Sequence, residues 1–247
     1  MDLGLKGRTA IVCGASSGIG LAAAESLAGE GANVVMFARR RELLEREAER
    51  IGGLAVRGDV TDPRDLERVV ARAVEAFGGI DILVNNSGGP PRTPAVGLTA
   101  EQIEAAVELL LISAVRLTEL CLPHLRESPA GRIINIESSS VRQPVENLAL
   151  SNAVRPGVIG WAKTLAREVG LDGITVNSIA PGQIETERLR ERYPSGPSAS
   201  DLQGIPLRRL GTPAEAGDVV CFLASDQAAY VTGTVIPVDG GLTRGLL

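Results

Sequence analysis

The chain has 247 residues, 44% of them hydrophobic and 22% charged, a balance typical of a folded domain rather than a disordered chain. Its formal net charge is -5 and its basic residues are interspersed with acids, so no extended positive surface is expected for nucleic acid. No apolar run reaches the roughly 18 residues of a membrane span, and the first residues lack a signal-peptide core. We therefore expect a single cytoplasmic domain over 1–247 without nucleic-acid or membrane partners.

The cysteines indicate neither a disulfide framework nor a metal site. Cys13, Cys121 and Cys221 lie far apart, with no CxxC or similar ligand spacing. An odd, sparse set is typical of reduced thiols in a cytoplasmic protein, and we expect no bound metal.

Short β-branched runs alternate along the chain with longer helical patterns, which indicates βαβ units and a parallel sheet. The predicted strands cover about 8–13, 33–38, 54–58, 80–84, 131–136, 174–180 and 234–238. The predicted helices cover about 18–29, 41–50, 63–77, 99–127, 148–170 and 213–224. The predicted fold class is α/β: a doubly wound, Rossmann-like parallel sheet of about seven strands with helices on both faces.

Two kinds of local signal refine this prediction. Thr99 followed by Gln102 predicts a capping box, and Pro63 and Pro213 are expected at the first positions of their helices. Residues 183–205 are rich in proline and serine, with one short charged helical piece at 185–192. We expect this stretch to be a lid-like insertion at the carboxyl edge of the sheet.

The first predicted strand runs directly into a glycine-rich turn, and a helix follows. Glycines at 14, 18 and 20 allow a tight turn and close backbone approach, so that N–H groups at the helix start face a pyrophosphate. The order of strand, turn and helix predicts a dinucleotide site. Its expected contacts are Gly14, Ser16, Ser17, Gly18, Ile19 and Gly20.

With its G-x-x-x-G-x-G spacing, the chain resembles the short-chain dehydrogenase/reductase family, in the branch that includes 3-oxoacyl-carrier-protein reductases. The likeness covers nearly the whole chain, although Cys13 stands where the family has threonine. The motifs that carry it are 13–20 (CGASSGIG), 59–62 (DVTD), 85–88 (NNSG), 181–182 (PG) and 238–241 (VDGG). The resemblance implies adenine contacts from Asp59 and Val60, support from Asn86, Ser87 and Gly88, and nicotinamide contacts from Pro181, Gly182, Ile184 and Thr186.

The end of the second strand favours NADP(H) over NAD(H). An acid there would bind the ribose hydroxyls of NAD and repel a 2′-phosphate, but the position holds Ala38. It is followed by Arg39, Arg40 and Arg41, whose guanidinium groups suit a phosphate. Arg39 is our first choice of phosphate ligand and Arg40 the second, although such arginines are also common at the solvated start of a helix.

The resemblance also implies an Asn–Ser–Tyr–Lys set for carbonyl reduction, and this chain keeps one member of it. Ser138 aligns with the serine, while Ser151, Arg155 and Leu110 stand at the tyrosine, lysine and asparagine positions. A serine hydroxyl has a much higher pKa than tyrosine, so the usual proton route is not expected. Arg155 keeps the positive charge and can still bind the nicotinamide ribose, and Leu110 fits an apolar helix ladder.

Other proton donors are less favoured by the sequence. Tyr193 lies in the lid-like insertion, and His124 near a helix end reads as a capping or surface residue. Burial can raise a glutamate pKa into the useful range, but Glu137 should point away from Ser138 because adjacent strand residues face opposite sides.

Three functions stay open at this point. The first is an NADP(H)-dependent oxidoreductase acting on a carbonyl or alcohol, in which Ser138, Ser151 and Arg155 form the catalytic site. The second is a catalytically inactive dinucleotide-binding relative that acts as a sensor or partner subunit. The third is another reaction in the same pocket, such as elimination or double-bond reduction. By resemblance we expect a homo-oligomer, a tetramer or dimer, and the sequence does not identify the substrate.

Overall fold

The structure is a computed structural model that describes residues 2–245; the outermost ends of the predicted domain and the Arg192 side chain lie outside the described residues. In this part of the chain one parallel sheet has the order β3-β2-β1-β4-β5-β6-β7. This confirms the predicted fold class. The strands are β1 (Thr9–Cys13), β2 (Asn33–Ala38), β3 (Leu54–Arg57), β4 (Ile82–Asn85), β5 (Arg132–Ile136), β6 (Thr175–Pro181) and β7 (Val235–Val238).

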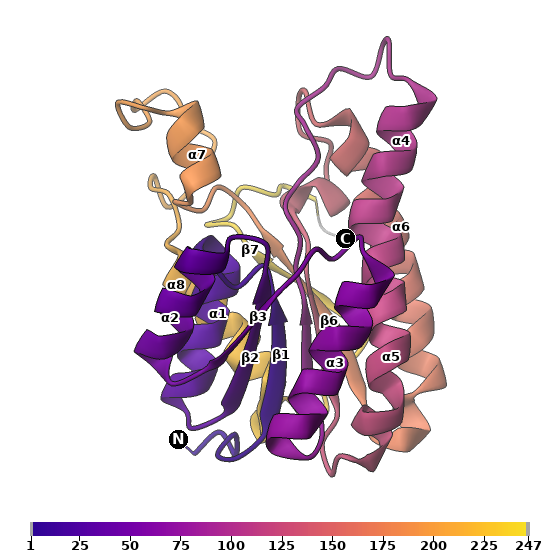
Figure 1. Ribbon diagram of the computed structural model, residues 1–247. Coiled ribbons are helices and arrows are strands. Elements are labelled where there is room, and N and C mark those ends of the chain that lie inside the picture. Colours follow the sequence, from indigo (N-terminus) through magenta and orange to yellow (C-terminus); the bar gives the residue numbers. More distant parts are fainter. Residues whose placement is uncertain (1, 246–247) are drawn as a thin grey trace.

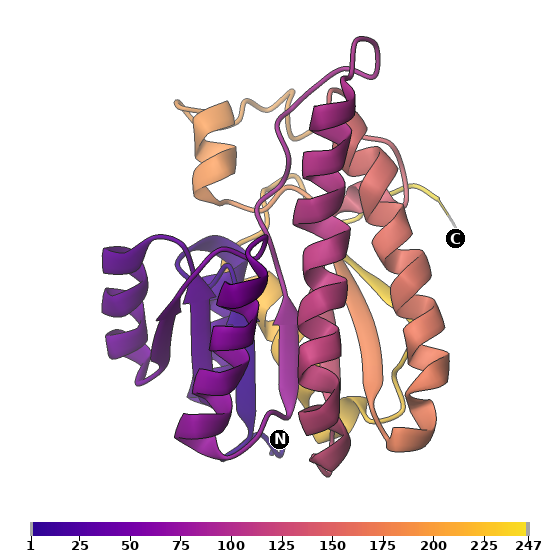
Figure 2. The ribbon, with the colours of Figure 1, turned by 45° about the vertical axis from the view of Figure 1, so that its right-hand side comes forward.

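Helices cover both faces of the sheet (Figures 1 and 2). One face carries α1 (Gly18–Gly29), α2 (Arg41–Ile51) and α8 (Pro213–Ala224), and the other carries α3 (Pro63–Phe77), α5 (Ser113–Glu127) and α6 (Ala149–Glu168). The alternation of side chains along each strand makes these two layers possible. In β1, Ala10 and Val12 pack into the core under α1 and α8, while Ile11 and Cys13 pack into the core under α3 and α5.

The predicted helix starts are confirmed. The Thr99 side chain accepts from the Gln102 backbone and the Gln102 side chain accepts from the Thr99 backbone, which closes the capping box at the start of α4 (Ala100–Val107). Asp62 caps α3 with Pro63 at its first position. Thr212 caps α8 in a second capping box, with Pro213 at its first position.

The helix predicted over 99–127 differs from a single α-helix. A π-helical turn, η1 (Glu108–Ile112), separates α4 from α5. A π turn adds one residue, which rotates the following face by about 100° relative to the preceding one. This explains why Leu110 is buried as predicted, whereas Ile103, an apolar residue seven positions earlier that would lie on the same face of a regular α-helix, is 44% exposed.

Pro156 lies inside α6, and the helix continues across it without interruption. Three short 3-10 turns complete the described structure: η2 (Ser139–Val141), η3 (Gly170–Asp172) and η4 (Asp226–Ala228). No helix within residues 2–245 has the length and apolar character needed to cross a membrane.

The strand order reverses between β1 and β4, which lie side by side at the centre of the sheet. In open α/β sheets, ligands bind beyond the carboxyl ends of the strands at such a reversal. Figure 1 shows α4 and α7 (Glu187–Arg192) above this edge on opposite sides. A ligand is therefore expected to contact the residues that follow Cys13 and Asn85.

Candidate active site

The turn after β1 has the geometry that its glycines predicted. Gly14 and Gly18 have φ angles of 61° and 59°, in the left-handed region that favours glycine. A Cβ on Gly20 would overlap the carbonyl oxygen of Gly14, so α1 can approach the turn only with glycine there. The Asn86 side chain donates to the Cys13 carbonyl over 3.1 Å and ties this turn to the end of β4.

The start of α1 is free to bind an anion. The first N–H groups of a helix have no partner within the helix, and among the described residues the Ser17 side chain makes no capping bond to them. Instead, Arg40 Nη2 donates to Ser17 Oγ over 2.5 Å and lies 3.4 Å from Ser16 Oγ. The predicted phosphate-binding residues of the turn therefore lie together, with a guanidinium beside them.

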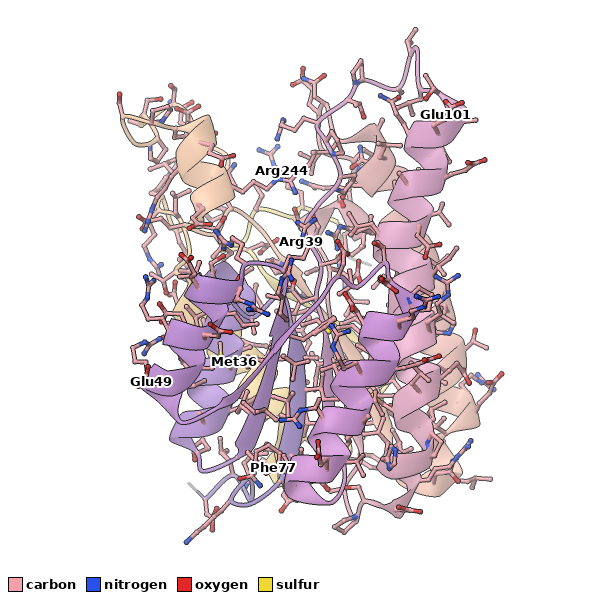
Figure 3. The ribbon with its side chains drawn as sticks, viewed as in Figure 1. Met36, Arg39, Glu49, Phe77, Glu101 and Arg244 are labelled. Atoms are coloured by element: carbon pink, nitrogen blue, oxygen red, sulfur yellow. The ribbon has the colours of Figure 1, made fainter. Side chains whose placement is uncertain are left out.

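The two candidate phosphate-binding arginines have different surroundings. Arg39 is 72% exposed at its side chain and lies 3.6 Å from Asp59, at the carboxyl end of the sheet (Figure 3). Arg40 reaches the glycine-rich turn and forms a 2.8 Å ion pair with Glu187 of α7. Ala38 is buried, as the last residue of β2. Arg39 and Arg40 directly follow Ala38, the position where an NAD-binding protein would carry an acid. Of the two arginines, Arg40 contacts the glycine-rich turn.

The remaining predicted cofactor residues lie around the same edge. Asp59 Oδ1 accepts from the Thr61 backbone N–H over 3.0 Å, and Val60 lines the central cavity. A Cβ on Gly18 would lie 3.3 Å from Thr186, so the chain after β6 approaches the glycine-rich turn. Pro181 and Ile184 are buried, Gly182 packs against Asp239, Ser87 lines the central cavity, and Gly88 is exposed.

The central cavity, of about 20 Å³, lies at the β1–β4 reversal and is large enough for a water-sized group. Both polar and apolar side chains form its wall. Its lining is Cys13, Val60, Asn85, Asn86, Ser87, Leu110, Ser113, Ala114, Leu117, Ile136, Glu137 and Arg155. Of the three predicted catalytic residues, the structure thus places only Arg155 on the cavity wall.

Arg155 forms a buried ion pair with Glu137. Arg155 Nη1 lies 3.0 Å from Glu137 Oε2, with the two side chains 8% and 6% exposed. Arg155 Nε donates to Ser151 Oγ over 3.2 Å, and Nη1 lies 3.4 Å from the Ile136 carbonyl. Within residues 2–245 no hydrogen bond is made by Nη2, so one face of the guanidinium is left for a ligand.

Burial raises the pKa of Glu137, and the nearby positive charge of Arg155 only partly opposes this. A carboxyl group of this kind can hold or release a proton closer to neutral pH than an exposed glutamate. The sequence argument had set Glu137 aside because strand residues alternate. Glu137 directly follows the last residue of β5, Ile136, and it lines the central cavity, whereas Ser138 does not belong to that lining.

Ser151 is buried and Ser138 is half-buried, and each makes hydrogen bonds within the protein. The buried Ser151 Oγ lies 3.1 Å from Ser140 Oγ and also accepts from Arg155. Ser138 Oγ accepts from the Ser140 backbone N–H over 3.2 Å, which leaves its own proton for a ligand. Leu110 packs with Leu150 and makes no polar contribution.

Cys13 is the thiol on the cavity wall, but burial raises its pKa to about 12, so it is not a nucleophile at neutral pH. Within the described residues no group of three or more His, Cys, Asp or Glu side chains is placed to hold a metal ion. The chemistry of this edge therefore depends on Glu137, Arg155 and the residues of the glycine-rich turn.

Arg188 is a residue that the sequence argument missed. It lies in α7, and its Nη2 donates to the Pro90 carbonyl over 2.7 Å. Burial and the positive charges of Arg155 and Arg92 lower its pKa. In the sequence it is one charge in a run that looks like a solvated helix, so no local pattern indicates that it reaches the segment after β4.

Comparisons with known proteins agree with this geometry. The profile of a family described as enoyl-(acyl carrier protein) reductase matches residues 14–243. The chain is 38% identical over 244 residues to 3-oxoacyl-[acyl-carrier-protein] reductase FabG of Vibrio cholerae, covering 97% of this chain and 99% of that one.

Two solved structures are similar over nearly the whole chain. One is an L-sorbose reductase of Gluconobacter frateurii complexed with NADPH and L-sorbose, with a TM-score of 0.92, 35% identity and full coverage of both chains. The other is YwfH, an NADPH-dependent reductase involved in bacilysin biosynthesis, with a TM-score of 0.92, 27% identity, and coverage of 97% and 99%.

Proposed function

The chain belongs to the short-chain dehydrogenase/reductase family, in its 3-oxoacyl-carrier-protein reductase-like branch, and from this we propose that it is an NADP(H)-dependent oxidoreductase that interconverts a carbonyl compound and its alcohol. One observation carries the proposal. The uncapped start of α1 meets a glycine-rich turn, and Arg40 lies against that turn where an acid is missing. A negatively charged dinucleotide fits this arrangement, and two structurally similar proteins are described as NADPH-bound or NADPH-dependent reductases.

The residues of this chain would divide the binding and chemical roles. The glycine-rich turn would hold the pyrophosphate, and Arg39 and Arg40 the 2′-phosphate. The bound cofactor supplies a hydride. Arg155 Nη2 and the Ser138 hydroxyl donate to the substrate oxygen and stabilise the negative charge that develops on it. Glu137 holds Arg155 in place as a carboxylate. Because its pKa is raised, its protonated form would give a proton to the alkoxide that hydride transfer leaves, and it would take a proton back from water.

Cofactor binding tests the proposal directly. We expect tight binding of NADPH and weaker binding of NADH in fluorescence titrations of the purified protein. Arg39→Ala and Arg40→Ala should each weaken NADPH binding by roughly 10- to 100-fold and change NADH binding little, because each removes a charged donor to the phosphate. Arg41→Ala is the matched control, since Arg41 faces Glu45 of its own helix. Equal losses for both cofactors, or no binding of either, would contradict the proposal.

The alternative is a dinucleotide-binding relative without catalytic activity. It is favoured by Ser151, whose hydroxyl is occupied within the protein rather than presented to the cavity. Turnover of a panel of ketones with NADPH separates the two functions. We expect measurable reduction by the wild type and at least about tenfold slower reduction by Ser138→Ala, because that change removes a proposed donor to the substrate oxygen. A folded, NADPH-binding wild type that reduces no ketone would support the alternative instead.

A further inference from the structure

The guanidinium of Arg188 lies at the rim of the candidate active site. It extends from α7 to the segment that directly follows the cavity residues Asn86 and Ser87, where it donates to Pro90 O over 2.7 Å. A Cβ on Gly89 would overlap Arg188 Nη1, so only a residue without a side chain leaves this space for the guanidinium. The residue as a whole stays exposed, which keeps it accessible to a ligand.

Several arginines at this edge have no carboxylate partner. Arg188 and Arg92 donate to the backbone carbonyls of Pro90 and Glu146, and no ion pair joins either of them, or Arg244, to an acid within residues 2–245. Glu191 is the acid near enough to offset part of the charge on Arg188. Elsewhere on this acidic chain, arginines typically pair with acids, as Arg72 does with Glu75.

The positive charges of these arginines repel one another, and a bound anion would reduce this repulsion. Arg155 and Arg92 both act on the charge of Arg188, and Figure 3 shows Arg244 beyond the carboxyl ends of the strands, at the same end as Arg39 and opposite Phe77. A guanidinium group binds a carboxylate through two parallel hydrogen bonds, a geometry that also orients the bound molecule.

We propose that the substrate of this site carries a carboxylate, that Arg188 binds it with the positive field of Arg92, and that this contact directs the reacting carbonyl toward Arg155. The inference rests on the proposed function, because it assigns the class of molecule that the same site reduces. It makes Arg188 a specificity-determining residue and Gly89 the residue that leaves room for it.

The experiment compares ketones that differ only in this charge: acetoacetate with methyl acetoacetate, and two longer acid–ester pairs, each with NADPH. The variants are Arg188→Ala, Arg188→Lys and Gly89→Ala, with Arg190→Ala as the matched control because Arg190 faces Glu185 on the solvent side of the same segment. We expect wild type to prefer the acids in kcat/KM. Arg188→Ala and Gly89→Ala should reduce this preference by roughly 10- to 100-fold, and Arg188→Lys should restore part of it.

The NADPH dissociation constant of each variant separates the explanations. An Arg188→Ala variant that loses NADPH affinity but keeps its acid preference would assign Arg188 to the phosphates of the cofactor and overturn the proposal. Equal rates for acids and esters in wild type would also overturn it. If no ketone is turned over, the proposed function fails. Calorimetric titration of the protein with NADP⁺ and each acid then tests the carboxylate site by itself. Acid binding that depends on Arg188 supports the inference, and the absence of such binding refutes it.

Discussion

At the scale of single residues, the Glu137–Arg155 pair is the feature that most distinguishes this site. The two charged side chains are almost completely buried, 3.0 Å apart, in a site where Ser151 and Arg155 stand at the family's tyrosine and lysine positions. Removing one partner of a buried ion pair strongly destabilises the folded protein, because the other charge stays in a poorly solvating environment. The Glu137–Arg155 pair therefore contributes to the stability of the folded protein as well as to the proposed reaction.

Arg155→Met tests this coupling. We expect the free energy of unfolding to fall by roughly 3 kcal/mol at pH 7, because the Glu137 carboxylate is left alone. The pKa of Glu137 is already raised by burial and should rise further. A raised folded-state pKa gives stability that is present in acid and lost as pH rises, so the variant should lose more stability than wild type between pH 5 and pH 8.

Urea unfolding at several pH values measures the effect. The second change Glu137→Gln should restore most of the stability and remove the added pH dependence. Arg72→Met is the control, since Arg72 pairs with Glu75 at the surface and its loss should have little effect. An Arg155→Met variant as stable as wild type at pH 8 would show that Glu137 is solvated in the folded protein.

At the scale of elements, the sequence predicted what local patterns determine. β-branched runs located the strands to within one or two residues, and Thr99, Pro63 and Pro213 marked helix starts correctly. The π turn at Glu108–Ile112 was missed because an extra residue within an apolar helix leaves the composition unchanged. Its effect appears only in three dimensions, in the outward position of Ile103.

Pro156 offers a test of helix α6. Inside a helix, proline removes a hydrogen bond to the carbonyl four residues earlier, here that of Asn152, and crowds it. Pro156 is exposed, so Pro156→Ala should lose few contacts and raise the free energy of unfolding by roughly 2 kcal/mol. Pro63→Ala is the control, because a proline at the first helix position lacks no bond. Thermal unfolding that does not change for Pro156→Ala would contradict this account.

At the scale of the whole molecule, the α/β fold class and the position of the glycine-rich turn followed from the sequence, since both depend on contiguous patterns. The strand order was not predicted, and neither were the contacts of the reacting part of the site, although Arg155 itself was a predicted catalytic residue. Glu137 and Arg155 are 18 residues apart, and Arg188 meets Pro90 across 98 residues. Such contacts depend on how separate segments converge at the carboxyl edge of the sheet, and neither periodicity nor spacing encodes that convergence in a single sequence.

Assembly is the other property of the whole molecule. We propose that the chain forms a homo-oligomer, as the resemblance implied, and exposed apolar side chains such as Ile103 on α4 and Phe222 on α8 are consistent with covered surfaces. Light scattering coupled to size-exclusion chromatography should give two or four times the 25.7 kDa of one chain. A monomer at micromolar concentration would refute the proposal.

The mutual dependence of Glu137 and Arg155 also constrains how this site can evolve. A lineage that replaces only one of them passes through a protein with an uncompensated charge in its core, which selection for folding removes. Descendants should therefore keep both residues or lose both together. Once both are present, loss of the positive charge at position 155 requires a matching change at position 137.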